Sequence, residues 1–237
     1  MTVALITGAS RGIGEATAVR LAERGVRVVI NFRDKQVRAQ RVAERIGELG
    51  GTAYPIRADL TDPDAVTDMI RATVERFGRL DLLVLNASGG LEQDMSPDYA
   101  MQLNRDAQVR LAELAAEQMT SGGRIVFVTS HEAHFFGDRD TLPEYAPVAA
   151  SKHAGEQALL ARSADYAQRG IGLTVVSGDL IDGTITAKLL DRVRPGLIEA
   201  RREVAGYLPT VESFAAEIAD AALTEQPEEL ILVGATG

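Results

Sequence analysis

The 237-residue sequence contains no cysteine, so the chain forms no disulfide and cannot use a thiolate as a nucleophile. No apolar run approaches the roughly 18 residues that a membrane-spanning helix requires. The first residues, "MTVALITGAS", lack the basic start of a secretion signal. We therefore expect a cytoplasmic protein that does not enter a membrane.

Positive charge is also scarce, since the net charge is −9 and the isoelectric point is about 4.9. A general nucleic-acid-binding protein needs a basic surface, so we expect no nucleic-acid partner. Hydrophobic residues make up 46% of the chain and charged residues 25%, which is ordinary for a globular protein with a core. The length suits one α/β domain.

Short apolar strands alternate with amphipathic helices along the whole chain. The expected strands are 2–7, 26–31, 52–59, 80–87, 123–129, 171–178 and 229–235. The expected helices are 12–25, 34–51, 62–78, 97–119, 147–168 and 211–224. Helices between successive strands indicate parallel pairing, so the pattern predicts a doubly wound parallel sheet with helices on both faces. No linker-like segment interrupts residues 1–237, which favours a single domain.

A glycine-rich turn, "TGASRGIG", joins the first strand to the first helix. Glycines with this spacing allow a tight turn, close approach to a pyrophosphate and close packing of the helix on the strand. The helix N-terminus adds free N–H groups and positive partial charge. An ordinary strand-to-helix turn is the alternative, but the flanking elements favour a nucleotide site. Its expected residues are Gly8, Ser10, Arg11, Gly12, Ile13 and Gly14.

Together with this turn, the later segments "LNAS", "VTS" and "ASK" resemble the short-chain dehydrogenase/reductase family, in order and over essentially the whole chain. The form TGxxxGxG resembles its short, single-domain branch. The resemblance implies a Rossmann-type domain with a seven-stranded sheet, NAD or NADP as cofactor, and a small carbonyl or alcohol substrate. It also implies a homodimer or homotetramer. Alanine-rich helices at 97–119 and 147–168 would allow close approach across a two-fold axis.

The end of the second strand, "INFRD", bears on the choice of cofactor. An acidic residue there would bind the ribose 2′-hydroxyl and repel a 2′-phosphate, but the matching position is near Phe32. Arg33 follows it, and Arg11 lies in the glycine turn, so two guanidinium groups could bind a phosphate. We therefore expect NADP(H) to be favoured over NAD(H). The alternative is that Arg33 is a solvated partner of Asp34.

The resemblance implies further cofactor contacts. Asp59 and Leu60 match the residues that contact adenine, and "LNASGG" places Asn86 and Ala87 where the family has NNAG, with departures at two positions. Gly178 and Thr184 are expected near the nicotinamide, although a serine replaces the family's proline before Gly178.

The segment 185–209 resembles the family's mobile substrate lid. Its arginines could bind an acidic substrate, or they could form the solvated face of a helix. These arginines are Arg192, Arg194, Arg201 and Arg202.

The resemblance also implies catalytic residues. The family uses a serine to hold the carbonyl oxygen, a tyrosine to donate a proton, a lysine to lower the tyrosine pKa and hold the ribose, and an asparagine to extend the proton path. Ser130, Lys152 and Asn104 fall on the expected elements. The segment 88–104 is short for the family, which implies a trimmed wall on the substrate side. We assign no metal ligands.

The catalytic tyrosine departs from this pattern. Side chains four residues apart share one helical face, as in the family's YxxxK motif, but here Val148 stands four residues before Lys152. The nearest tyrosine, Tyr145, lies seven residues before Lys152. Pro147 suits the first position of a helix, so Tyr145 is expected just before the helix, with its direction not determined.

Three interpretations remain open. Tyr145 could be the displaced acid, in which case we expect Lys152 to lower its pKa. His131, His134 or a water held by Lys152 could donate the proton instead. Alternatively, the site could be weak or silent, which would make the chain an NADP-binding sensor or partner subunit.

Overall fold

The computed structural model describes residues 1–91, 96, 98–226 and 228–236. Seven parallel strands form one sheet in the order β3-β2-β1-β4-β5-β6-β7. This confirms the predicted doubly wound parallel sheet. The strands are β1 Val3–Ile6, β2 Arg27–Phe32, β3 Ala53–Arg57, β4 Leu82–Leu85, β5 Arg124–Ser130, β6 Gly172–Gly178 and β7 Leu230–Val233.

The central strands are apolar without interruption because helices cover both of their faces. Successive side chains of a strand point to opposite faces, and they enter two separate hydrophobic clusters. One cluster receives Ile6, Val84, Val126 and Val176. The other receives Leu5, Leu83, Ile125 and Val175. The sheet is therefore a shared wall between two hydrophobic cores.

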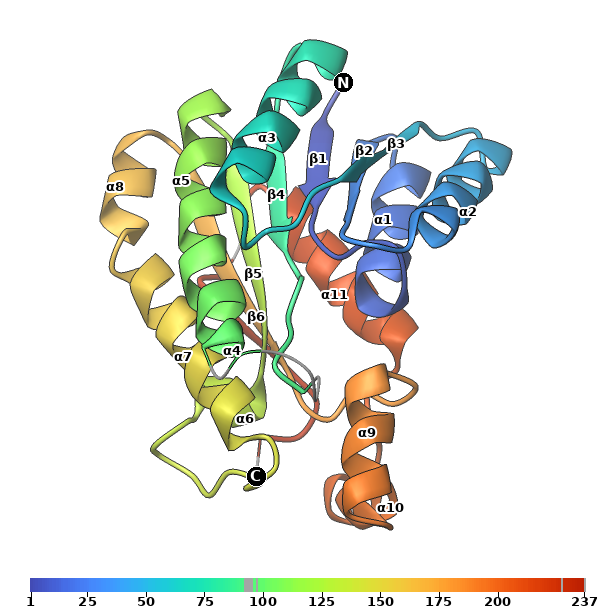
Figure 1. Cartoon of the computed structure of the whole chain (residues 1–237), viewed down its shortest axis with the longest axis vertical. Helices are drawn as coiled ribbons and strands as arrows, with labels where there is room; N and C mark the ends of the chain where they lie inside the picture. The colour runs from blue at the N-terminus through green and yellow to red at the C-terminus, as the bar shows by residue number, and fades with distance from the viewer. Residues whose placement is uncertain (92–95, 97, 227, 237) are drawn as a thin grey trace.

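Two groups of helices flank the sheet (Figure 1). On one side lie α1 Gly12–Glu23, α2 Gln36–Glu48 and α11 Val211–Leu223. On the other lie α3 Pro63–Phe77, α5 Gln108–Gln118, α7 Ala146–Leu160 and α8 Ser163–Gln168. The start of α3 shows how local sequence sets these bounds. Asp62 accepts hydrogen bonds from the backbone N–H groups of Asp64 and Ala65, and proline is the first helical residue.

Two helices expected to be continuous are interrupted. The expected helix 97–119 contains α4 Tyr99–Met101 and a π-helical turn η1 Gln102–Ala107 before α5 begins. The expected helix 147–168 divides into α7 and α8. Between β5 and α7, where no helix or strand was expected, lies a short helix, α6 His131–His134. The spacing of apolar residues does not predict such local changes in backbone hydrogen bonding, because it is similar on both sides of the break.

The segment expected to be a lid forms α9 Ile185–Val193 and α10 Leu197–Ala205. Figure 1 shows both helices at the end of the molecule opposite the N-terminus, near the carboxyl ends of the strands. Residues 92–95 and 97 of the segment expected to be a trimmed wall lie outside the described residues. Within the described part of the chain, no helix is long and apolar enough to cross a membrane.

Candidate active site

A large cleft of about 1280 Å³ opens at the carboxyl ends of the strands, where ligands of open α/β sheets bind. It brings together residues from most of the chain's length. Apart from Asn104 and the alternative donor His134, every residue predicted to bind cofactor or to catalyse lines this cleft. These are Gly8, Ser10, Arg11, Gly12, Ile13, Gly14, Arg33, Asp59, Leu60, Asn86, Ala87, Ser130, Tyr145, Lys152, Gly178 and Thr184.

The glycine turn forms a cradle that larger residues would fill. Gly8 and Gly12 have φ values of +63° and +58°, a region that side-chain-bearing residues rarely adopt. A Cβ atom added to Gly14 would lie 2.6 Å from Asn86 Nδ2 and 2.7 Å from the Gly8 carbonyl oxygen. The tight packing brings the N-terminus of α1 to the cleft, where its N–H groups suit a pyrophosphate. The cradle therefore fits a dinucleotide.

Thr7 braces this cradle, a role not predicted from the sequence. Its Oγ1 accepts hydrogen bonds from the backbone N–H groups of Asn86 and Ala87 at 2.8 and 2.9 Å. Asn86 Nδ2 donates to the Thr7 carbonyl oxygen at 2.8 Å. The signal available in the sequence was a threonine at the end of the first strand, directly before the first glycine of the turn.

Arg33 also lines the cleft and is held by two neighbours. Its Nε donates to Asp34 Oδ2 at 2.8 Å, and the hydrogen bond with Asp34 raises the pKa of Arg33. Its guanidinium also donates to the Tyr99 hydroxyl and lies 5.8 Å from the centre of the Tyr99 ring. The pair with Asp34, left open by the sequence, is therefore present. Tyr99 was not identified from the sequence.

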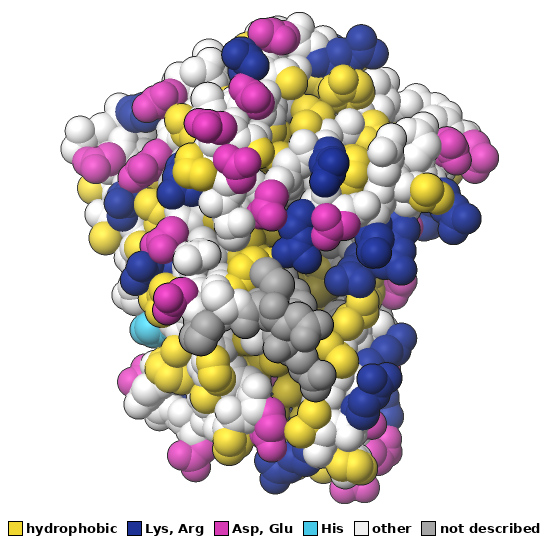
Figure 2. All heavy atoms as spheres, in the orientation of Figure 1, with side chains coloured by type: hydrophobic (Ala, Val, Ile, Leu, Met, Phe, Trp, Pro, Cys, Tyr) yellow, Lys and Arg dark blue, Asp and Glu magenta, His cyan; other side chains and the backbone are white. Residues whose placement is uncertain are grey.

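Arg11 is exposed at the start of α1 and also lines the cleft. Figure 2 shows Lys and Arg side chains gathered on the side of the molecule where α2 lies in Figure 1.

Asp59, which also lines the cleft, stabilises its own turn. Its Oδ1 accepts hydrogen bonds from the N–H and hydroxyl groups of Thr61 at 2.9 and 2.8 Å. The cleft thus combines basic groups with acidic ones at this end.

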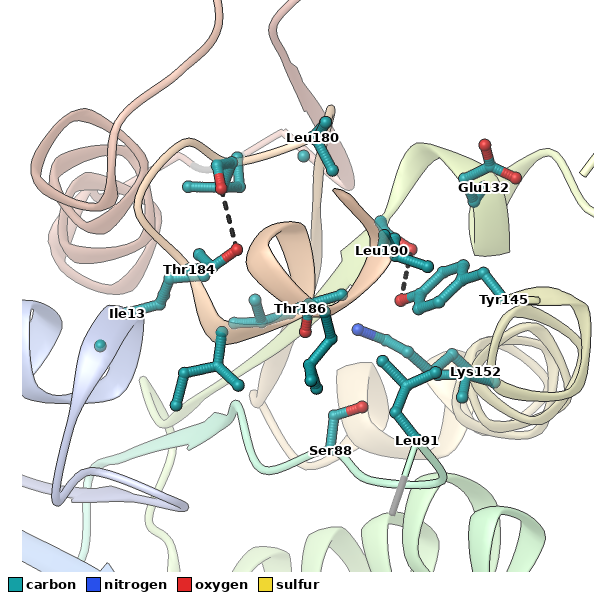
Figure 3. A pocket seen from close by; sticks show the side chains of 18 of the residues that line it. Ile13, Ser88, Leu91, Glu132, Tyr145, Lys152, Leu180, Thr184, Thr186 and Leu190 are labelled. Atoms are coloured by element: carbon teal, nitrogen blue, oxygen red, sulfur yellow. Dashed lines mark hydrogen bonds between the residues drawn. The ribbon is translucent and has the colours of Figure 1, made fainter. Parts of the chain in front are cut away.

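The hydroxyl groups of Ser130 and Tyr145 meet in the cleft. Ser130 is the last residue of β5, and Tyr145 directly precedes α7. Their oxygen atoms lie 3.3 Å apart. In Figure 3 the Tyr145 hydroxyl and the Lys152 ammonium group point toward the same part of the cleft. The chain between β5 and α7 therefore folds back and brings the Tyr145 phenol to Ser130, although Tyr145 lacks the four-residue spacing to Lys152 that the YxxxK motif has.

Val148 occupies the place expected for a tyrosine and belongs to an apolar cluster. It is 3% exposed and packs with Ala133, Tyr145, Ala149 and Leu190. A Cβ atom on Gly90 would lie 3.1 Å from Val148 Cγ2, so this side of the helix is closely packed.

The expected pKa shift of Tyr145 was wrong in sign. Burial raises the pKa of Tyr145, while its hydrogen bond with Ser130 acts in the opposite direction. The apolar cluster removes water from the phenol, and this disfavours the phenolate. Among the described residues, no hydrogen bond joins Tyr145 to Lys152. Burial also lowers the pKa of Lys152 to about 8, with the charge of Glu156 opposing that shift.

Asn104 lies behind the cleft in the π-helical turn and does not line it. Its Nδ2 donates to the Gly89 carbonyl oxygen at 2.8 Å and to Ser151 Oγ at 2.9 Å. Its Oδ1 accepts from the Gly89 N–H at 3.1 Å. Both amide hydrogens are therefore engaged in holding the 88–90 turn against α7. This arrangement supports a bracing role for the side chain instead of the expected proton path.

Neither histidine proposed as an alternative donor is placed as one. His131 lines the cleft, but its Nδ1 shares a hydrogen bond with Ser177 Oγ at 2.9 Å. Burial lowers the pKa of His131 to about 4, so it carries no proton to give near neutral pH. His134 is absent from the lining of the cleft, and its Nδ1 lies 2.5 Å from Glu156 Oε1.

Two residues expected near the nicotinamide have clear structural roles. A Cβ atom on Gly178 would lie 2.8 Å from the Phe214 ring, so glycine is required by packing. Thr184 caps α9, because its Oγ1 accepts from the Ala187 N–H at 3.1 Å. Both roles are compatible with a neighbouring ligand, since both residues line the cleft.

Two lid arginines are paired with acidic residues of the same chain. Arg201 Nε donates to Asp179 Oδ1 at 2.9 Å, and its Nη2 donates to the Ala235 carbonyl oxygen at 2.8 Å. Arg202 Nη2 donates to Asp182 Oδ2 at 3.1 Å. These contacts fasten α10 to the loops after β6 and β7. They do not support the alternative in which these two residues bind an acidic substrate.

Comparisons with known proteins agree with this geometry. The sequence profile of the short chain dehydrogenase family matches residues 2–193. Versicolorin reductase stcU of Emericella nidulans is 34% identical over 224 residues, covering 92% of this chain and 78% of the relative.

Two solved structures are similar over almost their full length. A short chain dehydrogenase from Burkholderia cenocepacia J2315 in complex with NADP has a TM-score of 0.83 and 30% identity, covering 100% of this chain and 97% of the other. The angucycline C-6 ketoreductase LanV with bound NADP has a TM-score of 0.79 and 29% identity, covering 99% and 95%.

Proposed function

Because the chain belongs to the short-chain dehydrogenase family, we propose that it is an NADP(H)-dependent oxidoreductase that reduces a carbonyl group, with Tyr145 as the proton donor. The observation that carries this proposal is the 3.3 Å separation of the Tyr145 and Ser130 hydroxyl oxygens in the shared cleft. A phenol and a serine hydroxyl placed together can both reach one substrate oxygen.

The cofactor end of the cleft supports a dinucleotide. The glycine cradle and the start of α1 suit the pyrophosphate. Arg11 and Arg33 line the same cleft, and in this proposal their guanidinium groups bind the 2′-phosphate. Two structurally similar proteins were solved with NADP, which favours the phosphorylated cofactor. When bound, the nicotinamide supplies or accepts the hydride.

The remaining steps belong to side chains of this chain. Ser130 and Tyr145 hold the carbonyl oxygen by donating hydrogen bonds to it. Tyr145 then gives its proton to that oxygen as negative charge develops there. The ammonium group of Lys152 stabilises the phenolate that remains, since an opposite charge favours the ionised form.

Burial of Tyr145 favours the reductive direction. An ordinary phenol, with a pKa of about 10, is already protonated at neutral pH. Burial raises the pKa of Tyr145 further, so the group carries the proton that reduction needs. Oxidation of an alcohol would require the phenolate as a base, and this form is disfavoured. We therefore expect faster reduction than oxidation near pH 7.

Leucine side chains form much of the substrate end of the cleft. Leu91, Leu142, Leu180, Leu190 and Leu197 line it and pack on the cluster that contains Tyr145. In Figure 3, Leu91 and Leu190 approach the cleft from opposite sides near Lys152. Such walls suit a carbonyl compound with a sizeable apolar body.

The test is a screen of purified protein with NADPH against a panel of ketones and quinones. We expect turnover that Ser130→Ala and Lys152→Ala each reduce strongly. Turnover that survives both substitutions would refute the site. Tight NADPH binding without turnover on any compound would instead support a sensor or partner subunit.

A further inference from the structure

Glu156 is a carboxylate enclosed by the protein. The residue is 0% exposed, its Oε1 lies 2.5 Å from His134 Nδ1, and its Oε2 has no hydrogen-bond partner within the described residues. Removing a carboxylate from water costs several kcal/mol unless charge or hydrogen bonds compensate. Its retention inside α7 therefore points to a role for its charge.

The spacing along α7 directs that charge toward the site. Glu156 follows Lys152 by four residues, so the two side chains share one face of the helix. Lys152 is 8% exposed, and its ammonium group points into the cleft (Figure 3). Within the described part of the chain, this ammonium group has no hydrogen-bond partner. No direct contact among these residues therefore compensates its positive charge.

Other charged groups around α7 are engaged elsewhere. From α6, His134 is bound to Glu156 and Glu132 Oε2 accepts from the Leu142 N–H at 3.2 Å. His131, also from α6, bonds to Ser177. From η1, Arg105 pairs with Asp106 at 2.6 Å.

At the start of α7, Tyr145 meets Ser130 of β5. None of these groups forms a hydrogen bond with Lys152 among the described residues, whereas the charge of Glu156 acts directly on its protonation.

We propose that Glu156, held in place by His134, is a positioning residue that keeps Lys152 protonated in the active site. The imidazole fixes one carboxylate oxygen and leaves the other without a partner. The carboxylate then acts on Lys152 through space. This proposal rests on the proposed function only in requiring that the lysine ammonium group supports Tyr145.

The small number of lysines allows a direct test. The chain has three, Lys35, Lys152 and Lys188, so protein labelled with ¹³C at lysine Cε gives three signals. Spectra of Lys35→Arg and Lys188→Arg assign them. We expect Lys152 in the wild-type protein to titrate near pH 8.

In Glu156→Gln, we expect the midpoint to fall by about one pH unit, the lower end of the effect of an opposite charge within a few ångströms. Glu113→Gln is the matched control, because it removes an exposed carboxylate from α5 that pairs with Arg162. It should leave the Lys152 midpoint unchanged. Glu156→Asp retains the charge and should keep most of the wild-type value.

An unchanged Lys152 midpoint in folded Glu156→Gln would overturn the proposal. A fall in Glu156→Asp equal to that in Glu156→Gln would also do so, because charge would then not be the cause. Should the glutamine variant fail to fold, the wild-type protein still decides. Its Glu156 carboxyl carbon must show the chemical shift of a carboxylate at pH 7, and the shift of a carboxylic acid would contradict the proposal.

Activity supplies a separate readout. The fall of the reductive rate at high pH should move down by the same interval as the lysine midpoint in Glu156→Gln. If the midpoint moves but no variant or wild-type protein reduces any carbonyl compound, the proposed function fails while the link between Glu156 and Lys152 stands. If the enzyme is active and the midpoint does not move, only the link fails.

Discussion

The cofactor end and the chemical end of the cleft differ in how closely they keep the family's sequence pattern. At the cofactor end, the glycine turn keeps its spacing, and a Cβ atom at Gly14 would collide with the Gly8 backbone. At the chemical end, a valine stands in the expected tyrosine position, and a phenol arrives from the turn before α7. Where a residue packs against backbone atoms, as Gly14 does, only one type of residue fits at that position in the sequence. A reaction needs only an atom in the right place, and more than one position in the sequence can supply it.

The largest expected effect is that of Tyr145→Phe, which removes one hydroxyl from the chemical end. We expect kcat for reduction to fall by about 10²- to 10⁴-fold, the usual contribution of a general acid. NADPH affinity, measured by calorimetry, should not change. Tyr54→Phe, on β3 and distant from the cleft lining, is the control. Full activity of Tyr145→Phe would show that Tyr145 is not the proton donor, and the chemical end would then have no relocated acid.

Loss of a cleft arginine should affect only the cofactor end. Arg33→Ala and Arg11→Ala should each weaken NADPH binding by about 1.5–3 kcal/mol, the range for hydrogen bonds to charged groups, and leave NADH nearly unchanged. Because Asp34 competes for Arg33, Asp34→Asn should tighten NADPH binding. Equal losses for both cofactors would show that these arginines do not bind the 2′-phosphate.

Gly14→Ala tests how strictly the cradle is packed. The added methyl group meets backbone atoms that cannot move aside, so we expect a loss of about 1–3 kcal/mol in the free energy of unfolding. NADPH and NADH should both bind more weakly. Gly47→Ala, where the added Cβ meets nothing within 4 Å, is the control and should stabilise by up to about 1 kcal/mol. Similar results for the two variants would contradict the packing argument.

Val148→Tyr restores the usual spacing to Lys152, but we expect it to lower activity. Val148 is enclosed with Tyr145 and Leu190, so the larger ring should overpack the cluster at a cost of about 1–3 kcal/mol. Thermal unfolding and reductive turnover would measure the two effects. A rise in turnover would mean that the natural site is disarmed and that Tyr145 does not fill the role.

The smallest expected effect is a pH dependence of the reductive rate. Burial lowers the pKa of Lys152 to about 8, so the ammonium group is present below that pH and is lost above it. The rate should be level from pH 6 to about 7, fall to about half near pH 8 and fall further at higher pH. A profile that rises through this range would show that the neutral amine is the active form.

Much of the fold was predictable because its signals are local. Buried parallel strands give apolar runs, and Asp62 with Pro63 marks the start of α3 in the sequence itself. The break at η1 was not predictable, because it depends on Asn104 meeting Gly89 and Ser151 across the fold.

The candidate site was likewise predictable only where its signals are local. Residues in the glycine turn could be assigned from spacing. The direction of Tyr145, the sign of its pKa shift and the burial of Glu156 could not be read from the order of residues, because each depends on packing across the fold. Assembly into a homodimer or homotetramer stays a prediction from the family resemblance and the alanine-rich helices.

The most direct test of the relocated acid is a crystal structure with NADPH and an unreactive analogue of a carbonyl substrate found in the screen. We predict that the analogue's oxygen lies within about 3.2 Å of both the Tyr145 hydroxyl and Ser130 Oγ, which is hydrogen-bond reach for a general acid. An oxygen held by Ser130 and a water or His131, with Tyr145 turned away, would contradict the account.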